Sequence, residues 1–475
     1  MEQSRDLEGH TYNRWFFILV LLFGSFTMSI SQSSVSNIYR PLMDTFNVQM
    51  TSVQWMTTGF MLVMCIMMPV SPWLLNNVKF KNLFMSILLT FDIGTLIIIF
   101  AHSFITLIIG RALEAIAVGI LFPSFQSVLL YITPKAKRGT VMGLAGLVMG
   151  SALALGPTIC SVILNFTAWR GLFMFFMVVV TVLFILALFA IKDVMPHKES
   201  HLDFISVILS IGLIGILYFV NAIGQLSKGG GSLSFLLLIL VVSLIMVTAF
   251  VYRQFHLKEP LLQLRVMKNL NFDLSMGLTG ISYIALIVVT IIYPQYYQTV
   301  LGIPAKYSGF ALIPGSIIMS VLNPLTGHLA DKFGFKRIMV IGMSMILLGW
   351  LALTIMPFQF GLIAMIITSS LIKGGNAFVM MPATTLGGDS LPKEYISHGT
   401  AVITTVRQIL GSTGVMIASL ILTNVTNDSL GRGIRMSLAR NNGYHVVFLT
   451  FFIIEIFGMI MALMIKNNHK EGAKK

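Results

Sequence analysis

The chain has 475 residues, of which 56% are hydrophobic and only 10% are charged, and its formal net charge is +14. A soluble globular domain carries roughly 25% charged residues, so this composition excludes a water-soluble fold and indicates an integral membrane protein in a lipid bilayer. The basic residues stand in short clusters between apolar runs rather than in one stripe interleaved with aromatic residues, which argues against a nucleic-acid partner.

Neither the N-terminal stretch nor the two cysteines indicate a specific chemical function. Residues 1–14 are polar, and the apolar run that follows is too long for a cleaved signal peptide, so we expect the first span to remain in the mature protein. Cys65 and Cys160 each lie in an apolar run, which predicts neither a disulfide framework nor a metal site.

Fourteen apolar segments are long enough to cross the bilayer, because a membrane-spanning helix needs about 20 such residues. If the N-terminus is cytoplasmic, most of the 31 basic residues fall on the cytoplasmic side, so both termini are predicted to be cytoplasmic. The sequence therefore predicts an all-α polytopic membrane protein. In chain order the segments are 15–38, 53–75, 83–101, 105–131, 140–165, 169–191, 203–224, 233–252, 270–297, 307–329, 338–356, 360–386, 400–424 and 444–465.

The first segment ends in a polar stretch, SQSSVSNIYRP at 31–41. Gln32 and Asn37 in this stretch can offer hydrogen bonds to a substrate, although a polar contact between helices explains them equally well.

Ionisable residues inside the segments are candidates for function, because a charge in hydrocarbon is costly. Arg111 and Glu114 lie three apart in IIGRALEAIAVGI and share a helix face. Glu114 and Asp92 each lie about nine residues from an outer segment end, which places them roughly 14 Å deep. Glu114 either has a functional role or is the static partner of Arg111. The full set is Asp92, Arg111, Glu114, Lys373, Arg407 and Glu455, with Asp273 near an inner segment end.

Two further motifs stand out along the chain. In the fifth segment, GPTICS contains Gly156 and Pro157, which permit a close and bent helix crossing. The loop GHLADKFGFKR at 327–337 contains Gly327 and Gly334, which permit close backbone approach, and Asp331, which can cap a helix start and pair with Lys or Arg.

These motifs resemble those of the major facilitator superfamily. The loop 327–337 is similar to that family's signature loop G-x-L-a-D-r-x-G-r-[RK], which ends here at Arg337, and GPTICS is similar to its antiporter motif G-P-x-x-G-G. Arg111 matches the family's arginine motif, with Glu114 in place of the usual Gln. Together with VRQILGSTGV at 406–415, the motifs resemble the fourteen-span drug:proton antiporters of bacteria. The sequence departs from the pattern at Gln32, where the family usually has an acid, and at Asn76 in the equivalent first-half loop.

The resemblance implies an N-terminal six-helix bundle at 15–191, two additional helices at 203–252 and a C-terminal six-helix bundle at 270–465. The cytoplasmic ends would be residues 1–14 and the basic tail 466–475. It further implies alternating access, with substrate held near the membrane midplane.

The resemblance also assigns roles to the residues singled out above. Glu114 or Asp92 would carry the proton. Arg111, Gln32, Asn37, Lys373 and Arg407 would line the substrate cavity. The gating motifs would be formed by Asp331, Gly327, Gly334, Arg337, Gly156 and Pro157.

Two transport functions stay open. One is a proton-coupled antiporter that exports lipophilic or cationic drugs; the other is a dedicated exporter of one metabolite, lipid or peptide, for which Lys373 and Arg407 would suit an anionic cargo. A membrane-embedded enzyme is disfavoured because the sequence has no HExxH motif and no Walker A loop. We expect no cofactor, since the proton gradient would drive transport, and a monomer in the plasma membrane of a Gram-positive bacterium.

Overall fold

The computed structural model describes residues 4–5, 7, 9, 11–196, 201–226, 232–257, 259–303, 310–355 and 361–466. Nearly all of these residues are helical. The exception near the start is an antiparallel pair of two-residue strands, β1 (Ser4–Arg5) and β2 (Thr11–Tyr12), in which Ser4 lies opposite Tyr12. Residues 467–475 of the predicted basic tail lie outside the described residues, as does the predicted short loop at 357–359.

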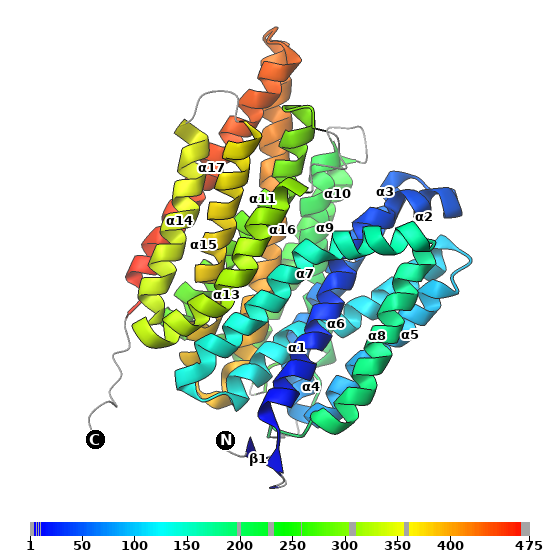
Figure 1. The fold of residues 1–475 in the computed structure, drawn as a ribbon, viewed down its shortest axis with the longest axis vertical. Helices are drawn as coiled ribbons and strands as arrows, with labels where there is room; N and C mark the ends of the chain where they lie inside the picture. Colours follow the sequence, from blue (N-terminus) through cyan, green and yellow to red (C-terminus); the bar gives the residue numbers. More distant parts are fainter. Residues whose placement is uncertain are drawn as a thin grey trace. The chain divides into compact units, whose positions relative to one another are not determined.

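The helices follow one another with short connections (Figure 1). In chain order they are α1 (Arg14–Ser34), η1 (Val35–Ile38), α2 (Tyr39–Phe46), α3 (Met50–Val53), α4 (Trp55–Asn77), α5 (Phe80–Ile99), α6 (Phe104–Ile132), η2 (Lys135–Lys137), α7 (Arg138–Phe166), α8 (Trp169–Ala190), α9 (Phe204–Leu226), α10 (Leu233–His256), η3 (Leu264–Lys268), α11 (Leu270–Thr299), η4 (Phe310–Leu312), α13 (Ile313–Phe333), α14 (Phe335–Ile355), α15 (Leu362–Asp389), η5 (Lys393–Tyr395), α16 (Ile396–Gly431) and α17 (Met436–Met464).

Twelve helical stretches in the described part of the chain are long and apolar enough to cross a membrane, and the bent helix α7 raises the number to thirteen. Each of the fourteen predicted segments overlaps a helix, including 203–224, which corresponds to α9. The structure thus confirms a helical membrane protein with many spans. The full count of fourteen and the cytoplasmic placement of both termini stay predictions.

Two helices extend well beyond the predicted apolar segments. The segments 400–424 and 444–465 lie within longer helices, because α16 continues to Gly431 and α17 begins at Met436. Hydropathy detects only the apolar part of a helix, and a helix need not end where its apolar part ends. An ion pair between Arg432 and Asp428, four residues apart and 2.8 Å between nitrogen and oxygen, supports the end of α16.

Side-chain caps fix the start of two long helices. The Asn13 side chain accepts hydrogen bonds from the backbone N–H groups of Trp15 and Phe16 at 3.1 and 3.2 Å, and α1 follows it. Asn269 caps α11 in the same way. Each cap satisfies backbone donors that have no partner inside the helix, so both helices begin at defined residues.

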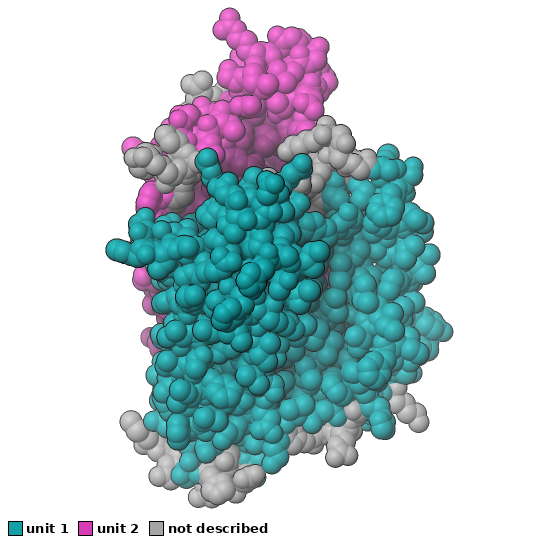
Figure 2. All heavy atoms as spheres, turned by 90° about the vertical axis from the view of Figure 1, so that its right-hand side faces the viewer, with its two compact units in different colours: residues 1–132, 148–265, 393–405 teal, residues 133–147, 266–392, 406–475 magenta. Residues whose placement is uncertain are grey.

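The chain divides into two compact units, which Figure 2 colours separately. Unit 1 comprises residues 1–132, 148–265 and 393–405, and unit 2 comprises residues 133–147, 266–392 and 406–475. In unit 1, α6 packs against α4 and α5, and α9 packs against α10. In unit 2, α15 packs against α11, α13 and α14, and α14 also packs against α17. An aromatic cluster that includes Tyr296, Trp350 and Phe448 fills the core of unit 2.

Candidate functional site

The predicted charged pair lies where α5 and α6 touch along their backbones. A Cβ added to Gly94 would lie 2.7 Å from the Gly110 carbonyl oxygen, and one added to Gly110 would lie 2.6 Å from the Gly94 carbonyl oxygen. Only glycine permits helices to approach this closely. The contact brings Thr95 beside Glu114, and the Thr95 hydroxyl donates a hydrogen bond to Glu114 Oε1 at 2.7 Å.

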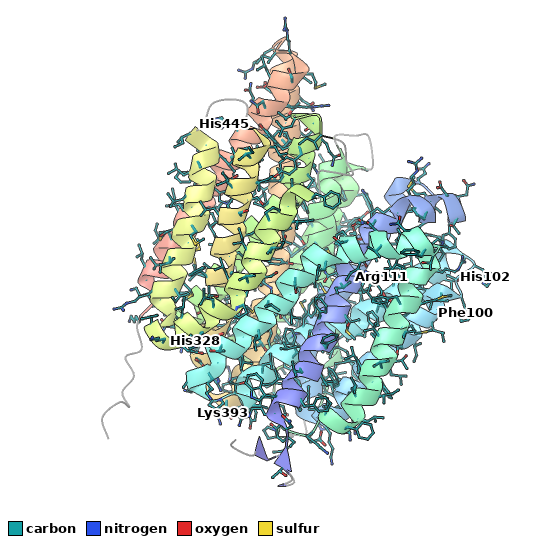
Figure 3. The ribbon with its side chains drawn as sticks, viewed as in Figure 1. Phe100, His102, Arg111, His328, Lys393 and His445 are labelled. Carbon is teal, nitrogen blue, oxygen red and sulfur yellow. The ribbon has the colours of Figure 1, made fainter. Side chains whose placement is uncertain are left out.

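Arg111 and Glu114 form an ion pair in the interior of unit 1, and Figure 3 labels Arg111 there. The two residues are 1% and 0% exposed. Arg111 Nη1 also donates to Ser31 Oγ at 3.2 Å, and its Nε donates to the Met56 carbonyl oxygen at 3.3 Å. The guanidinium carbon lies 4.1 Å from the centroid of the Phe60 ring. A planar guanidinium suits these simultaneous contacts, because its donors point in fixed directions.

The pair therefore connects four helices of unit 1. Arg111 contacts α1 and α4, and Glu114 contacts α5 through Thr95. A buried charge that loses its partner destabilises a protein strongly, so each member depends on the other. The prediction that the two residues share a helix face is confirmed, because their side chains are in direct contact. This geometry suits a locked ion pair, and it also places one protonatable carboxylate at the centre of the helix packing.

Asp92 occupies a separate place on α5. Its Oδ2 accepts a hydrogen bond from the Thr181 hydroxyl of α8 at 3.1 Å. Its Oδ1 is buried and has no hydrogen-bond partner among the residues that the structure describes. Asp92 lies three residues before Thr95, and so about one turn from the residue that binds Glu114. The two predicted proton-carrying acids thus have different hydrogen-bond partners, and one carboxylate oxygen of Asp92 is free to gain one.

The polar stretch formed by the end of α1 and by η1 contacts the glycine–proline motif of α7. Asn37 Nδ2 donates to the Pro157 carbonyl oxygen at 3.0 Å and to Ser161 Oγ at 3.3 Å. A Cβ added to Gly156 would lie 1.9 Å from Ser33 Oγ, so this position has no room for a larger residue. For Asn37, the structure thus shows a polar contact between helices, which was the alternative to substrate binding. Gln32, on the same stretch, is half-buried.

Two predicted cavity cations lie in unit 2. Lys373 of α15 is 3% exposed, and its Nζ donates to Ser316 Oγ at 2.9 Å and to the Leu312 carbonyl oxygen at 3.4 Å. Arg407 of α16 is equally buried, and its guanidinium carbon lies 5.4 Å from the centroid of the Tyr283 ring. Within the described ranges, neither cation forms an ion pair with a carboxylate.

Asp331 of the predicted gating loop caps the start of α7. Its Oδ1 accepts from the Gly139 N–H at 2.8 Å, and its Oδ2 accepts from the Thr140 N–H and hydroxyl at 2.8 and 2.7 Å. A Cβ on Gly327 would lie 2.1 Å from the Gly139 carbonyl oxygen, and Gly334 has a φ of +91° just after α13. The predicted helix-capping role of Asp331 and the need for glycine at both positions are thus explained by the geometry.

An ion pair of residues outside this loop lies at the start of α7. Arg138, at the first position of α7, pairs with Asp389 at the end of α15, and its Nε donates to the Thr133 carbonyl oxygen at 3.1 Å. The sequence pattern assigned no role to either residue of this pair. The signal that could have found them is an acid at the end of one span and an arginine at the start of another. Arg337 is exposed.

A bundle of long apolar helices with charged pairs and single cations buried inside it defines an integral membrane transporter. The model of the Major Facilitator Superfamily matches residues 21–415, so the chain belongs to that superfamily. This membership confirms the predicted family and shows a transporter rather than an enzyme.

Curated relatives match over nearly the whole length. The chain is 31% identical over 474 residues to the uncharacterized MFS-type transporter YcnB of Bacillus subtilis, covering 99% of each chain. It is 30% identical over 451 residues to the lincomycin resistance protein LmrB of Listeria monocytogenes, covering 94% of each. Among solved structures, the human organic anion transporter MFSD10 aligns with a TM-score of 0.68 at 10% identity, covering 94% of this chain and 99% of that one, which shows the fold alone.

Proposed function

We propose that the protein is a proton-coupled antiporter that exports lipophilic or cationic drugs from the cytoplasm by alternating access, in the plasma membrane of a Gram-positive bacterium. Family membership supports transport of small molecules. A relative named for lincomycin resistance, similar over 94% of both chains, supports drugs as the cargo.

The buried pair of Arg111 and Glu114 carries the coupling part of the proposal. An antiporter needs a carboxylate that gains a proton from one side of the membrane and loses it to the other. When Glu114 is protonated its charge is lost, and the attraction that holds Arg111 to it weakens. Because Arg111 also contacts Ser31 and Met56, a change at Glu114 acts on the packing of α1 and α4 against α6. Proton exchange at one oxygen is in this way linked to helix movement.

Asp92 is the second candidate for the proton. It is half-buried, and one of its oxygens lacks a partner among the described residues, so it can take up a proton without first breaking an ion pair. Protonation of Asp92 would leave the Arg111–Glu114 pair intact. Substitution of Glu114 and substitution of Asp92 are therefore expected to affect proton coupling differently.

Transport in inverted membrane vesicles with an imposed pH gradient tests the proposal. Addition of a substrate drug, with lincomycin as the first trial, is expected to release protons from the acidified interior of vesicles that contain the protein. Glu114→Gln is expected to abolish this release, and Asp428→Asn, at an exposed residue of α16, to preserve it. If Glu114→Gln couples normally and Asp92→Asn does not, Asp92 carries the proton. If no drug moves protons through the wild type, antiport is wrong.

A dedicated exporter of one metabolite, lipid or peptide is the second candidate. It is favoured by Lys373 and Arg407, two buried cations without a carboxylate partner among the described residues of unit 2. A cavity for drugs that are themselves cations gains nothing from two such charges. Addition of acidic metabolites, in place of drugs, to the outside of the same inverted vesicles distinguishes the two candidates.

A further inference from the structure

Arg407 is held at a close crossing of α16 and α11. A Cβ added to Gly411 would lie 2.7 Å from two ring carbons of Tyr283, and one added to Gly414 would lie 2.6 Å from Ile284 Cγ2. The Tyr283 ring is therefore pressed against α16 one turn beyond Arg407. This contact fixes the ring beneath the guanidinium, at 5.4 Å from guanidinium carbon to ring centroid.

The guanidinium of Arg407 lacks the acceptors that its charge requires. Arg407 is 3% exposed, and its Nε and Nη1 make no hydrogen bond to any residue that the structure describes. An arginine side chain stays protonated and carries five N–H donors. Arg111 in unit 1 shows the usual solution, with a carboxylate, a hydroxyl and a carbonyl around it. Arg407 has an aromatic face beneath it, but no carboxylate of the described part of the chain pairs with it.

The described residues around Arg407 include polar side chains that are not acidic. Gln408 Oε1 accepts from the Tyr283 hydroxyl at 3.5 Å, a long contact. On the α15 side, Asn376 Nδ2 donates to the carbonyl oxygen and hydroxyl of Ser282, the residue next to Tyr283, at 2.9 and 2.6 Å. Lys373 lies one turn before Asn376 on α15. Lys373, which has no carboxylate partner among the described residues, is thus one turn from a residue bound to this same stretch of α11.

We propose that Arg407 anchors a carboxylate group of the transported substrate. The proposal rests on the second candidate function, the dedicated exporter, and deepens it by naming a substrate class, amphiphiles that carry one carboxylate. A carboxylate is planar and accepts two parallel hydrogen bonds from a guanidinium. One guanidinium balances one negative charge, which favours a carboxylate over a doubly charged phosphate. The Tyr283 ring supplies a flat apolar surface for the adjoining part of the substrate.

Binding to the purified full-length protein in lipid nanodiscs tests this assignment without any proton gradient. The probes are dansyl-phenylalanine, which carries a carboxylate, and its uncharged amide, each titrated by fluorescence anisotropy against nanodiscs without protein. The wild type is expected to prefer the carboxylate. Arg407→Gln is expected to lose about 10- to 100-fold in affinity for the carboxylate, as charge-assisted hydrogen bonds are lost, and little for the amide.

Matched variants keep the test decisive. Arg432→Gln removes an exposed arginine directly after the same helix and is expected to bind both probes like the wild type. Arg407→Lys keeps the charge and is expected to retain part of the preference, whereas Tyr283→Leu is expected to weaken both probes alike. Thermal unfolding checks that each variant is folded. Equal affinity of the wild type for the two probes, or an unchanged preference in Arg407→Gln, overturns the proposal. Neither result depends on whether drugs move protons in vesicles, so the two proposals fail separately.

Discussion

The Thr95 hydroxyl of α5 donates a hydrogen bond to the Glu114 carboxylate of α6 at 2.7 Å, while Arg111 binds the other carboxylate oxygen. The acid is thus held from a neighbouring helix and from its own helix. Protonation of Glu114 would remove the negative charge that both contacts bind, so both contacts would weaken. Protonation and helix packing are for this reason expected to change together.

Mutual dependence of Arg111 and Glu114 is testable in a double-mutant cycle. Arg111→Leu leaves the Glu114 carboxylate buried without its partner and is expected to lower the free energy of unfolding by about 3–5 kcal/mol. The double variant Arg111→Leu, Glu114→Leu is expected to be more stable than Arg111→Leu alone, because no unpaired charge remains. Denaturant unfolding in mixed micelles provides the measurement. Additive losses would contradict the coupling.

The crossing of α5 and α6 predicts a penalty for a single methyl group. Gly94→Ala places a Cβ 2.7 Å from a backbone oxygen that cannot move independently, and we expect a loss of about 1–3 kcal/mol. Gly431→Ala is the control, because a Cβ there meets nothing within 4 Å. Thermal unfolding of both variants in the same detergent measures the difference. A Gly94→Ala variant as stable as Gly431→Ala would show that the helices separate easily.

Removal of the Asp331 carboxylate is expected to loosen the start of α7. Asp331→Asn keeps an acceptor but loses the charge that favours the helix N-terminus, at a cost of about 1 kcal/mol. Hydrogen–deuterium exchange at the amides of Gly139 and Thr140 should then become faster, since both donate to Asp331. Asp44→Asn, at an exposed position, should leave that exchange unchanged. Slow exchange in Asp331→Asn would assign the cap to other groups.

The ion pair between Asp203, directly before α9, and Arg253 of α10 predicts that the stability of the fold depends on pH. Arg253 donates from Nε and Nη2 to the two oxygens of Asp203 at 2.8 and 2.9 Å, and these bonds hold the pKa of Asp203 below its usual value. A lowered pKa in the folded state means that the pair stabilises the fold above the ordinary aspartate pKa. This contribution is lost as pH falls through the lowered pKa.

The melting temperature should therefore fall more for the wild type than for Asp203→Asn as the pH is lowered from neutral into the acid range below that pKa. Both proteins lose other carboxylate contributions equally, so the difference between the two curves isolates the pair. Parallel curves would show that the pair adds no stability. The effect is small because the Arg253 side chain is 34% exposed.

Helix positions could be predicted from the sequence because the bilayer imposes a strong signal of about 20 apolar residues per span. The contact of Arg111 with Glu114 could also be predicted, since a spacing of three fixes two residues on one helix face. The other hydrogen-bond partners of Arg111 and Glu114 could not be predicted. Ser31 and Thr95 resemble many other hydroxyl residues in the spans, and their selection depends on helix rotation and tilt.

Contacts between segments that are distant in the chain likewise could not be predicted from the sequence pattern. Asp331 was predicted to cap a helix, but its target at Gly139 lies 192 residues away along the chain. The pairing of Arg138 with Asp389 spans 251 residues, and neither residue stands inside an apolar run where its charge would attract notice. These contacts depend on how closely the helices approach one another, for example where Gly139 meets Gly327. Hydropathy carries no information about that approach.

The glycine contact between α5 and α6 has a consequence for the transport cycle. With a carbonyl oxygen of each helix filling the space beside a glycine of the other, neither helix can slide along or rotate against its neighbour without first moving apart. We therefore expect α5 and α6 to move as one rigid body. Asp92 and Glu114 would then keep a constant separation through every state of the transporter, and a distance measured once between labels at these two helices should hold in all of them.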